Sequence, residues 1–125
     1  MHGRSAQRSE MAMQVVYVVG SFRDLETSRA VAQRFGDLGF TALLSLPGDP
    51  RGIDGCLDRV ARSDFVYVSN PRGEVGKGVS LDIGYALGLG KPVYASRPVE
   101  DPPIGHRIEV ADVEDLARQV RVGGK

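Results

Sequence analysis

The sequence predicts a single doubly wound α/β domain. Short, continuously apolar segments rich in Val and Tyr alternate with segments in which apolar residues recur every three or four positions. The first pattern is typical of parallel strands buried on both faces, and the second is typical of amphipathic helices. A length of 125 residues fits one domain with one core. The alternation therefore predicts a parallel sheet of about five strands with helices on both faces.

The first half of the chain predicts two strands and two helices. Residues 15–19 form a β-branched run that ends at Gly20, as expected for the first central strand. From Asp24 the spacing of apolar residues predicts a helix that stops at Gly39. A second strand follows over 41–46. The next helix is predicted by apolar residues at helical spacing, which are Ile53, Leu57, Val60 and Ala61.

The second half continues the alternation. A third buried strand is predicted over 65–68, and a glycine-rich loop leads from it into a helix over about 79–89. The fourth strand is expected at 93–95 and a short fifth strand at 107–110, after a proline-rich loop. A last helix begins at Asp112. Its apolar stripe consists of Val113, Leu116, Ala117 and Val120.

Connections between these elements should be right-handed, which predicts a flavodoxin-like strand order of 2-1-3-4-5. In such sheets a ligand binds beyond the carboxyl ends of the strands, at the point where the strand order reverses. Here that point lies between the first and third strands. The loops over residues 20–24 and 70–80 should therefore form the binding site.

Composition excludes several classes of protein. Sixteen basic residues balance sixteen acidic residues, so the net charge is zero and we expect no nucleic-acid partner. No apolar run approaches the roughly 18 residues needed to cross a bilayer, so we expect no membrane partner. The only cysteine, Cys56, excludes an internal disulfide and offers no metal-ligand spacing. We expect a cytoplasmic protein with no metal and no cofactor.

The first twelve residues differ from the rest of the chain. Residues 1–12 are polar and lack the apolar core of a signal peptide. They predict a disordered leader or an overlong start, with Met11 and Met13 as alternative initiators. The folded domain is expected over residues 13–125.

The first loop carries four groups that suit a nucleotide. Gly20 lets the backbone approach a ligand, and Ser21, Phe22 and Arg23 supply a hydroxyl, an aromatic ring and a guanidinium. An alternative stays open, in which Gly20 makes a tight turn and Ser21 or Asp24 caps the following helix. Arg23 is then an ordinary surface charge.

The second loop places glycines and basic residues before a helix N-terminus, which is a common setting for anion binding. The loop is not a Walker A motif, because Gly73 is too close to the Gly-Lys pair and no Ser or Thr follows that pair. A dinucleotide fingerprint should follow the first strand, which disfavours an NAD-type oxidoreductase. The candidate binding residues are Asn70, Arg72, Gly76, Lys77, Gly78 and Ser80.

Asp82 is the candidate catalytic carboxylate. We place it in the first turn of the third helix, where the helix dipole and free N–H groups favour the ionised form. The alternative is a stabilising acid at a helix start, with Ser80 as a simple N-cap. Gly84 and Gly88, one turn apart, predict close packing of this helix against the sheet or a neighbouring helix.

Four segments carry a family resemblance: 17–23, 64–70, 80–86 and 90–93. Together they resemble the nucleoside 2-deoxyribosyltransferase superfamily, which includes the 2'-deoxynucleoside 5'-phosphate N-hydrolases. The similarity spans most of residues 13–96. The resemblance implies cleavage of the N-glycosidic bond of a nucleoside or nucleotide, through attack of a carboxylate on the anomeric carbon.

The resemblance also implies roles for individual residues. Asp82 matches the family nucleophile, and Tyr17 matches a tyrosine close to that carboxylate. Gly20, Ser21 and Arg23 match the loop that lines the nucleotide. On this basis Asp82 and Tyr17 are the expected catalytic residues.

The sequence departs from the family pattern at three positions, two of which bear on hydrolysis against transfer. The family nucleophile is usually Glu, which is one methylene longer than Asp82. Gly76 and Asn70 stand where the transferases carry acids, so transferase activity is disfavoured. Glu74 is then the nearest candidate for a second carboxylate, and its alternative is a solvated loop glutamate.

The expected partners follow from the same resemblance. Arg72 and Lys77 are expected to contact a phosphate, which favours a nucleoside monophosphate over a free nucleoside, and the alternative that both are ordinary surface charges stays open. A small domain of this family would need a neighbour to close its site, so we expect a homodimer or a higher homo-oligomer. The alternative function is a non-catalytic nucleotide-binding or sensing module of the same fold.

Overall fold

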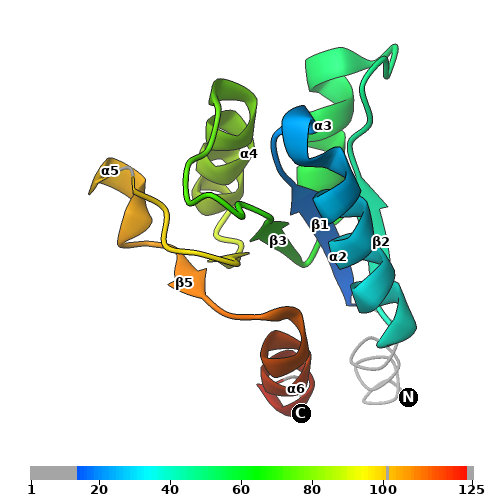
Figure 1. Ribbon diagram of the computed structural model, residues 1–125, viewed down its shortest axis with the longest axis vertical. Coiled ribbons are helices and arrows are strands. Elements are labelled where there is room, and N and C mark those ends of the chain that lie inside the picture. Colours follow the sequence, from blue (N-terminus) through cyan, green and yellow to red (C-terminus); the bar gives the residue numbers. More distant parts are fainter. Residues whose placement is uncertain (1–13, 101, 124–125) are drawn as a thin grey trace.

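The computed structural model describes residues 14–100 and 102–123 (Figure 1). The leader expected over residues 1–12 lies outside the described residues. Five strands form one sheet in the order β2-β1-β3-β4-β5, and every neighbouring pair is parallel. This confirms the predicted fold class and strand order. The strands are β1 (Val15–Val19), β2 (Thr41–Leu44), β3 (Phe65–Val68), β4 (Val93–Ala95) and β5 (Glu109–Val110).

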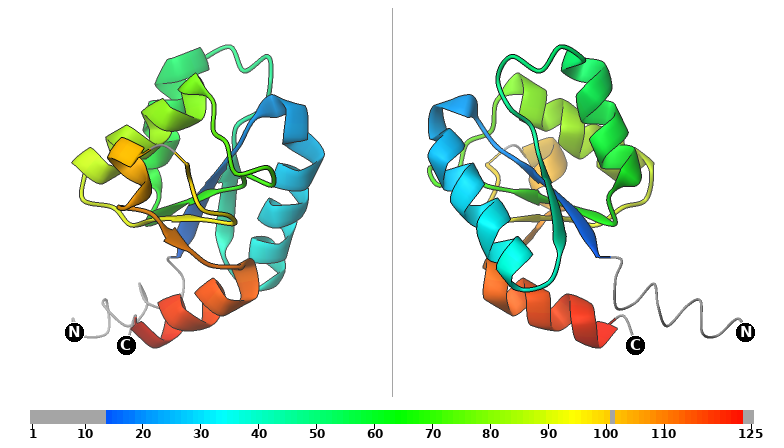
Figure 2. Two further views of the ribbon diagram at one scale, coloured as in Figure 1. Left: turned by 60° about the vertical axis from the view of Figure 1, so that its left-hand side comes forward. Right: turned by 90° about the vertical axis from the view of Figure 1, so that its right-hand side faces the viewer.

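Helices cover both faces of the sheet (Figure 2). Helices α2 and α6 pack on one face, and α3 and α4 pack on the other. The helices are η1 (Phe22–Asp24), α2 (Leu25–Asp37), α3 (Gly52–Arg62), α4 (Lys77–Gly88), α5 (Pro102–Gly105) and α6 (Val113–Gly123). No described helix has the length and apolar character needed to cross a membrane.

Aromatic rings build the core beneath α2 and α6. The Phe35 ring of α2 makes edge contacts with Phe40, Phe65 and Tyr67, at centroid distances of 5.3, 6.0 and 5.2 Å. Each such contact contributes about 0.5–1.5 kcal/mol beyond the burial of its area. The predicted stripe of α6 completes this core, with Val113, Leu116 and Ala117 buried.

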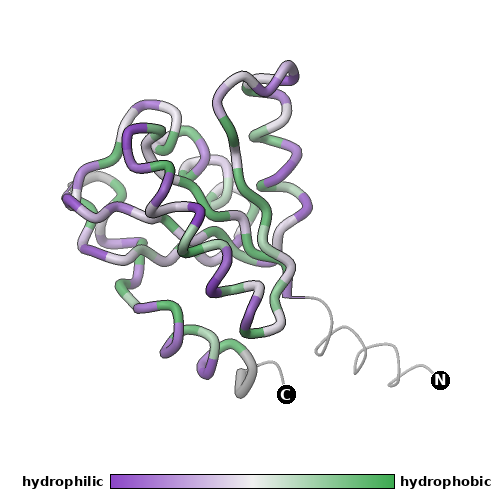
Figure 3. Tube along the Cα trace, turned by 45° about the vertical axis from the view of Figure 1, so that its right-hand side comes forward, coloured by the Kyte–Doolittle hydropathy of each residue, from purple (hydrophilic) through white to green (hydrophobic). Residues whose placement is uncertain are grey.

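The opposite core positions the functional site. Side chains alternate along a strand, so Val16 and Val18 of β1 face α2 while Tyr17 and Val19 face α3 and α4. Figure 3 shows the hydrophobic strands running through the centre of the molecule. The alternation therefore sends the Tyr17 side chain under the helix that carries Asp82.

Helix α4 begins earlier than the sequence predicts. It starts at Lys77 rather than near residue 79, because Gly76 is its N-cap. Ser80 is therefore not the N-cap, and its hydroxyl donates to the Gly76 carbonyl oxygen at 2.9 Å. Asp82 lies in the second turn of the helix rather than the first, which corrects our placement. The helix dipole acts mainly on the first turn, so it does not account for the ionisation of Asp82.

The prediction that the α4 glycines pack against this chain's own sheet or helices is wrong. Gly84 and Gly88 are both exposed. A Cβ built on either would meet no atom of the described residues within 4 Å. Their spacing therefore leaves a shallow, apolar surface on the outside of α4.

Candidate functional site

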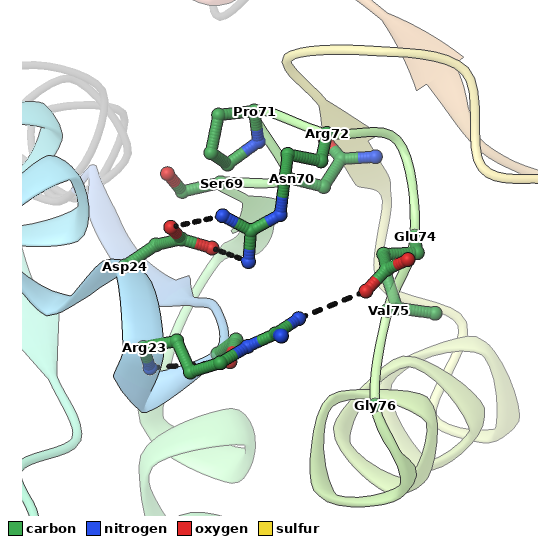
Figure 4. A pocket seen from close by; sticks show the side chains of 10 residues that line it. Arg23, Asp24, Ser69, Asn70, Pro71, Arg72, Glu74, Val75 and Gly76 are labelled. Carbon is green, nitrogen blue, oxygen red and sulfur yellow. Dashed lines mark hydrogen bonds and ion pairs between the residues drawn. The ribbon is translucent and has the colours of Figure 1, made fainter.

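Two cavities lie beyond the carboxyl ends of β1 and β3, where the strand order reverses. The larger one, here the apolar cavity, has a volume of about 300 Å³. It is lined by Tyr17, Val19, Gly20, Ser21, Phe22, Ser45, Ile53, Cys56, Gly76, Gly78, Val79 and Asp82. The smaller one, here the polar cavity, has about 80 Å³ (Figure 4). It is lined by Ser21, Arg23, Asp24, Ser69, Asn70, Pro71, Arg72, Glu74, Val75 and Gly76.

Ser21 and Gly76 line both cavities, so one ligand can extend from the apolar to the polar side. The structure brings most of the predicted residues to this place. Lys77 and Ser80 line neither cavity. An apolar pocket joined to a small polar one is typical of a site for a ligand with an apolar ring and a charged group.

Gly20 allows the two strand ends to approach each other. A Cβ on Gly20 would lie 2.7 Å from the Ser28 Oγ and 2.8 Å from the Ser69 carbonyl oxygen, both inside contact distance. Ser21 then caps the short helix η1, because its Oγ accepts a hydrogen bond from the Arg23 N–H at 3.2 Å. The loop therefore owes its shape to close packing and to a cap, and it still borders both cavities.

Asp82 is a buried carboxylate with an unused oxygen. The residue is 5% exposed, and its Oδ1 has no hydrogen-bond partner among the described residues. Burial raises the pKa of the Asp82 carboxyl to about 6, and the positive charge of Arg59 opposes this rise. Burial thus disfavours the ionised form relative to a solvated aspartate, although the carboxylate still predominates above about pH 6. This corrects our expectation that the helix start favours the ionised form.

Tyr17 lies on the floor of the apolar cavity, close to Asp82. Its side chain is fully buried, and its hydroxyl makes no hydrogen bond of ordinary geometry within the described structure, although Ser45, Cys56 and Arg59 are close enough to interact with it. Burial raises the pKa of Tyr17 above its ordinary range, and the negative charge of Asp82 adds to the rise. The hydroxyl therefore stays protonated and can donate. The unpaired Asp82 Oδ1, which costs about 1–3 kcal/mol, indicates a place where a ligand supplies the missing partner.

Arg59 of α3 is the residue that sequence reasoning missed. Its guanidinium forms an ion pair with Asp49, and the two side chains are only 15% and 18% exposed. The Arg59 Cζ lies 5.8 Å from the centre of the Tyr17 ring, and Nη1 donates to the Cys56 Sγ at 3.9 Å. The only sequence signal was an arginine three positions after Cys56, which places both on one side of a helix.

Two ion pairs cross the polar cavity (Figure 4). Arg72 Nη1 and Nη2 donate to the two oxygens of the Asp24 carboxylate, each at 2.9 Å. Arg23 Nη2 donates to the Glu74 Oε1 at 2.9 Å. Glu74 does not line the apolar cavity, and among the described residues that do, Asp82 is the only carboxylate. Glu74 therefore does not serve as a second carboxylate beside Asp82 in this arrangement.

Asn70 is buried and its side chain is fully engaged by the protein. Its Nδ2 donates to the carbonyl oxygens of Gly73 at 3.3 Å and Arg97 at 3.0 Å. Its Oδ1 accepts from the Ser96 hydroxyl at 3.0 Å and from the Arg97 N–H at 3.1 Å. The amide group thus joins the loop after β3 to the loop after β4. No hydrogen-bonding capacity of this side chain is left for a ligand.

The N-terminus of α4 faces the site. Gly76 is the N-cap and lines both cavities, and Gly78 lines the apolar one. The first N–H groups of a helix have no partner within the helix and carry partial positive charge, which suits an anion. Within the described residues, no group of three or more His, Cys, Asp or Glu side chains could hold a metal ion.

No protein-family model and no curated protein matches this sequence. The chain is similar in structure to a conserved protein from Enterococcus faecalis V583, with a TM-score of 0.63 and 18% identity, over 90% of this chain and 99% of that chain. This likeness shows the fold alone. The chain also aligns with the flavodiiron core of Flv1 from Synechocystis sp. PCC6803, with a TM-score of 0.46 and 14% identity, over 98% of this chain and 31% of that chain.

Proposed function

We propose that this chain hydrolyses the N-glycosidic bond of a nucleoside monophosphate, with Asp82 as the nucleophile. The observation that carries the proposal is the buried Oδ1 of Asp82, which has no hydrogen-bond partner in the described part of the chain and borders the apolar cavity. A carboxylate stripped of water is more nucleophilic than a solvated one, and a pKa of about 6 keeps it ionised at neutral pH.

The two cavities provide for the two ends of such a ligand. Phe22 and Ile53 are 52% and 50% exposed although both line the apolar cavity, so a flat base can pack against them. Stacking of a base on an aromatic ring contributes about 1–3 kcal/mol. The phosphate is proposed to lie at the polar cavity and the α4 N-terminus, near Ser21, Arg23 and Arg72.

In the proposed reaction, Asp82 Oδ1 attacks the anomeric carbon and the carbon–nitrogen bond breaks. The base leaves with the bonding electron pair and takes up a proton, and the sugar phosphate is held as an ester of Asp82. Water then hydrolyses this ester and restores the carboxylate, so one water is consumed for each base and sugar phosphate released. The Tyr17 hydroxyl stays protonated and makes no hydrogen bond to Asp82 in this structure, so it is proposed to act beside the carboxylate by donating to the bound ligand.

A chromatographic assay for free base tests the proposal. Wild type and Asp82→Asn are incubated with a panel of ribo- and deoxynucleoside monophosphates, and thermal unfolding is followed on the same panel. Base release by wild type and its loss in Asp82→Asn, with the variant still folded, is the expected result. Absence of release by a folded wild-type protein from every member of the panel would contradict it.

The second candidate function is a nucleotide-binding or sensing module without catalysis. The observation that favours it is the single carboxylate of the apolar cavity, since most glycosidic hydrolases use a pair. A nucleotide that raises the unfolding temperature in wild type and in Asp82→Asn alike, with no base released, would support this function.

We also propose that the protein forms a homodimer or a higher homo-oligomer through the outer face of α4. This face consists of Leu81, Gly84, Tyr85, Gly88 and Leu89, all of which are exposed. It carries no charged side chain, and its two glycines allow the same face of a second copy to come close. The occupant is therefore a second copy rather than a charged partner.

Light scattering after size exclusion tests this assembly. Leu81→Glu is expected to yield monomers, because it places a charge within the apolar contact. Leu46→Glu is the matched control, since Leu46 is similarly exposed, at 43% against 46%, but lies outside α4. A monomeric wild type would overturn the assembly without affecting the catalytic proposal.

A further inference from the structure

Arg59 occupies an unusual place for an arginine. Its side chain is 15% exposed and runs between α3 and the Tyr17 ring, rather than out into solvent. The Asp49 carboxylate, from the loop before α3, holds the guanidinium from the far side. Arg59 does not itself line the apolar cavity. It therefore acts behind the cavity wall, on the groups that form that wall.

Among the described residues, the cavity wall in front of Arg59 carries three titratable side chains. Tyr17 from β1 and Cys56 from α3 are the titratable side chains that share the cavity wall with Asp82, and Arg59 is the cation that acts on Asp82. A guanidinium over an aromatic ring attracts the ring face. The same positive charge favours the ionised form of a nearby carboxylate. Arg59 thus contacts the Tyr17 ring directly and acts on Asp82 only through its charge, from a position that does not line the cavity.

We propose that Arg59 is a positioning residue of this site, tethered by Asp49, which fixes the Tyr17 ring and offsets the negative charge of Asp82 inside an apolar wall. The catalytic meaning of this role rests on the proposed function, whereas its electrostatic part does not. Burial alone would drive the Asp82 carboxyl further toward its neutral form, in which it is not a nucleophile. Arg59 keeps enough of it ionised at neutral pH.

The test measures Asp82 directly. The carboxyl carbon of Asp82 is followed by nuclear magnetic resonance in protein labelled with 13C-aspartate, and the signal is assigned by its loss in Asp82→Asn. Arg59→Met removes the charge at similar length, and Arg59→Lys keeps the charge. Arg62→Met is the control, because Arg62 lies on the same helix but pairs with Asp58 at the exposed surface.

The titration midpoint of Asp82 is expected to rise in Arg59→Met by roughly 0.5 to 1 pH unit, and to stay near the wild-type value in Arg59→Lys and Arg62→Met. The ionised fraction at pH 6 then falls by about two- to fivefold. If Arg59→Met does not fold, Arg59→Gln removes the charge while keeping hydrogen-bond donors toward Asp49, and it is expected to raise the midpoint in the same direction. An unchanged midpoint in a folded Arg59→Met or Arg59→Gln overturns the proposal.

Activity provides a separate measurement where base release is found. The acid limb of the kcat profile is expected to move upward in Arg59→Met together with the resonance midpoint, while KM changes little because Arg59 lies behind the wall. A purely structural Arg59 would lower stability without moving either midpoint. A wild type that releases no base leaves the resonance result intact, so failure of the proposed function and failure of this inference are distinguishable.

Discussion

Asp82→Asn is expected to stabilise the protein at neutral pH although it removes the proposed nucleophile. The pKa of the Asp82 carboxyl is about 6 in the folded protein against an ordinary 3.8. A difference of about two units corresponds to about 3 kcal/mol between the two protonation states. Because the folded protein binds this proton more tightly than the unfolded chain, stability is lost as the pH rises between about 4 and 6. Asn has no charge to bury at any pH.

Urea unfolding of wild type and Asp82→Asn at about pH 4 and about pH 7.5 measures this effect. The amide of Asn has its own packing and hydrogen-bonding cost, but that cost is the same at both pH values. The other carboxylates titrate alike in the two proteins. The change in unfolding free energy caused by Asp82→Asn should therefore be more favourable at the higher pH by about 2–3 kcal/mol. Equal changes at the two pH values would refute the desolvation of Asp82.

Three further predictions concern residues around the cavities. Gly20→Ala should destabilise the fold by about 1–3 kcal/mol, because its Cβ collides with the backbone carbonyl at the end of β3. The exposed Gly36→Ala in α2 should instead stabilise it by about 0.5–1 kcal/mol, and thermal unfolding that ranks the two variants alike would contradict the close approach. Asn70→Ala should lower the free energy of unfolding by about 2–3 kcal/mol, because buried groups in two loops lose their hydrogen bonds to this side chain. An unchanged free energy in urea unfolding would disprove that Asn70 holds the two loops together. Cys56 is the only cysteine and lines the apolar cavity, so its alkylation should be slower when a nucleoside monophosphate fills that cavity. The alkylation rate should fall about tenfold when nine-tenths of the protein is bound. A rate that a saturating ligand does not change would mean that the ligand binds elsewhere.

The fold was predictable because its signals are local. The run at 65–68 is apolar at every position, and all four residues are buried in β3. Right-handed crossovers then leave few arrangements for such strands, which is why the order was predicted as well. The predicted strand at 107–110 shrank to Glu109–Val110, because only Glu109 and Val110 pair with β4. The ends of β5 are set by which of its residues pair with β4. That pairing cannot be read from the sequence of the segment alone.

The sequence predicts where the site lies, but it does not predict which side chains contact one another there. Topology alone brings residues 20–24 and 70–80 together at the switch point. The engagement of Asn70 depends on Ser96 and Arg97, which lie in a loop far along the chain. No periodicity or spacing connects those positions. Arg59 was missed for the same reason, because its partners come from separate elements.

The position of Asp82 along its helix shows how a small shift reverses a physical conclusion. With the helix starting near residue 79, Asp82 would meet the positive end of the dipole and its pKa would fall. Because Gly76 caps the helix, Asp82 instead lies in the second turn, where burial dominates and the pKa rises to about 6. Burial raises the pKa of the Asp82 carboxyl, and the positive charge of Arg59 partly opposes this rise. In the proposed reaction, ionised Asp82 attacks above about pH 6, and protonated Asp82 does not, so the activity should have an acid limb at that pH.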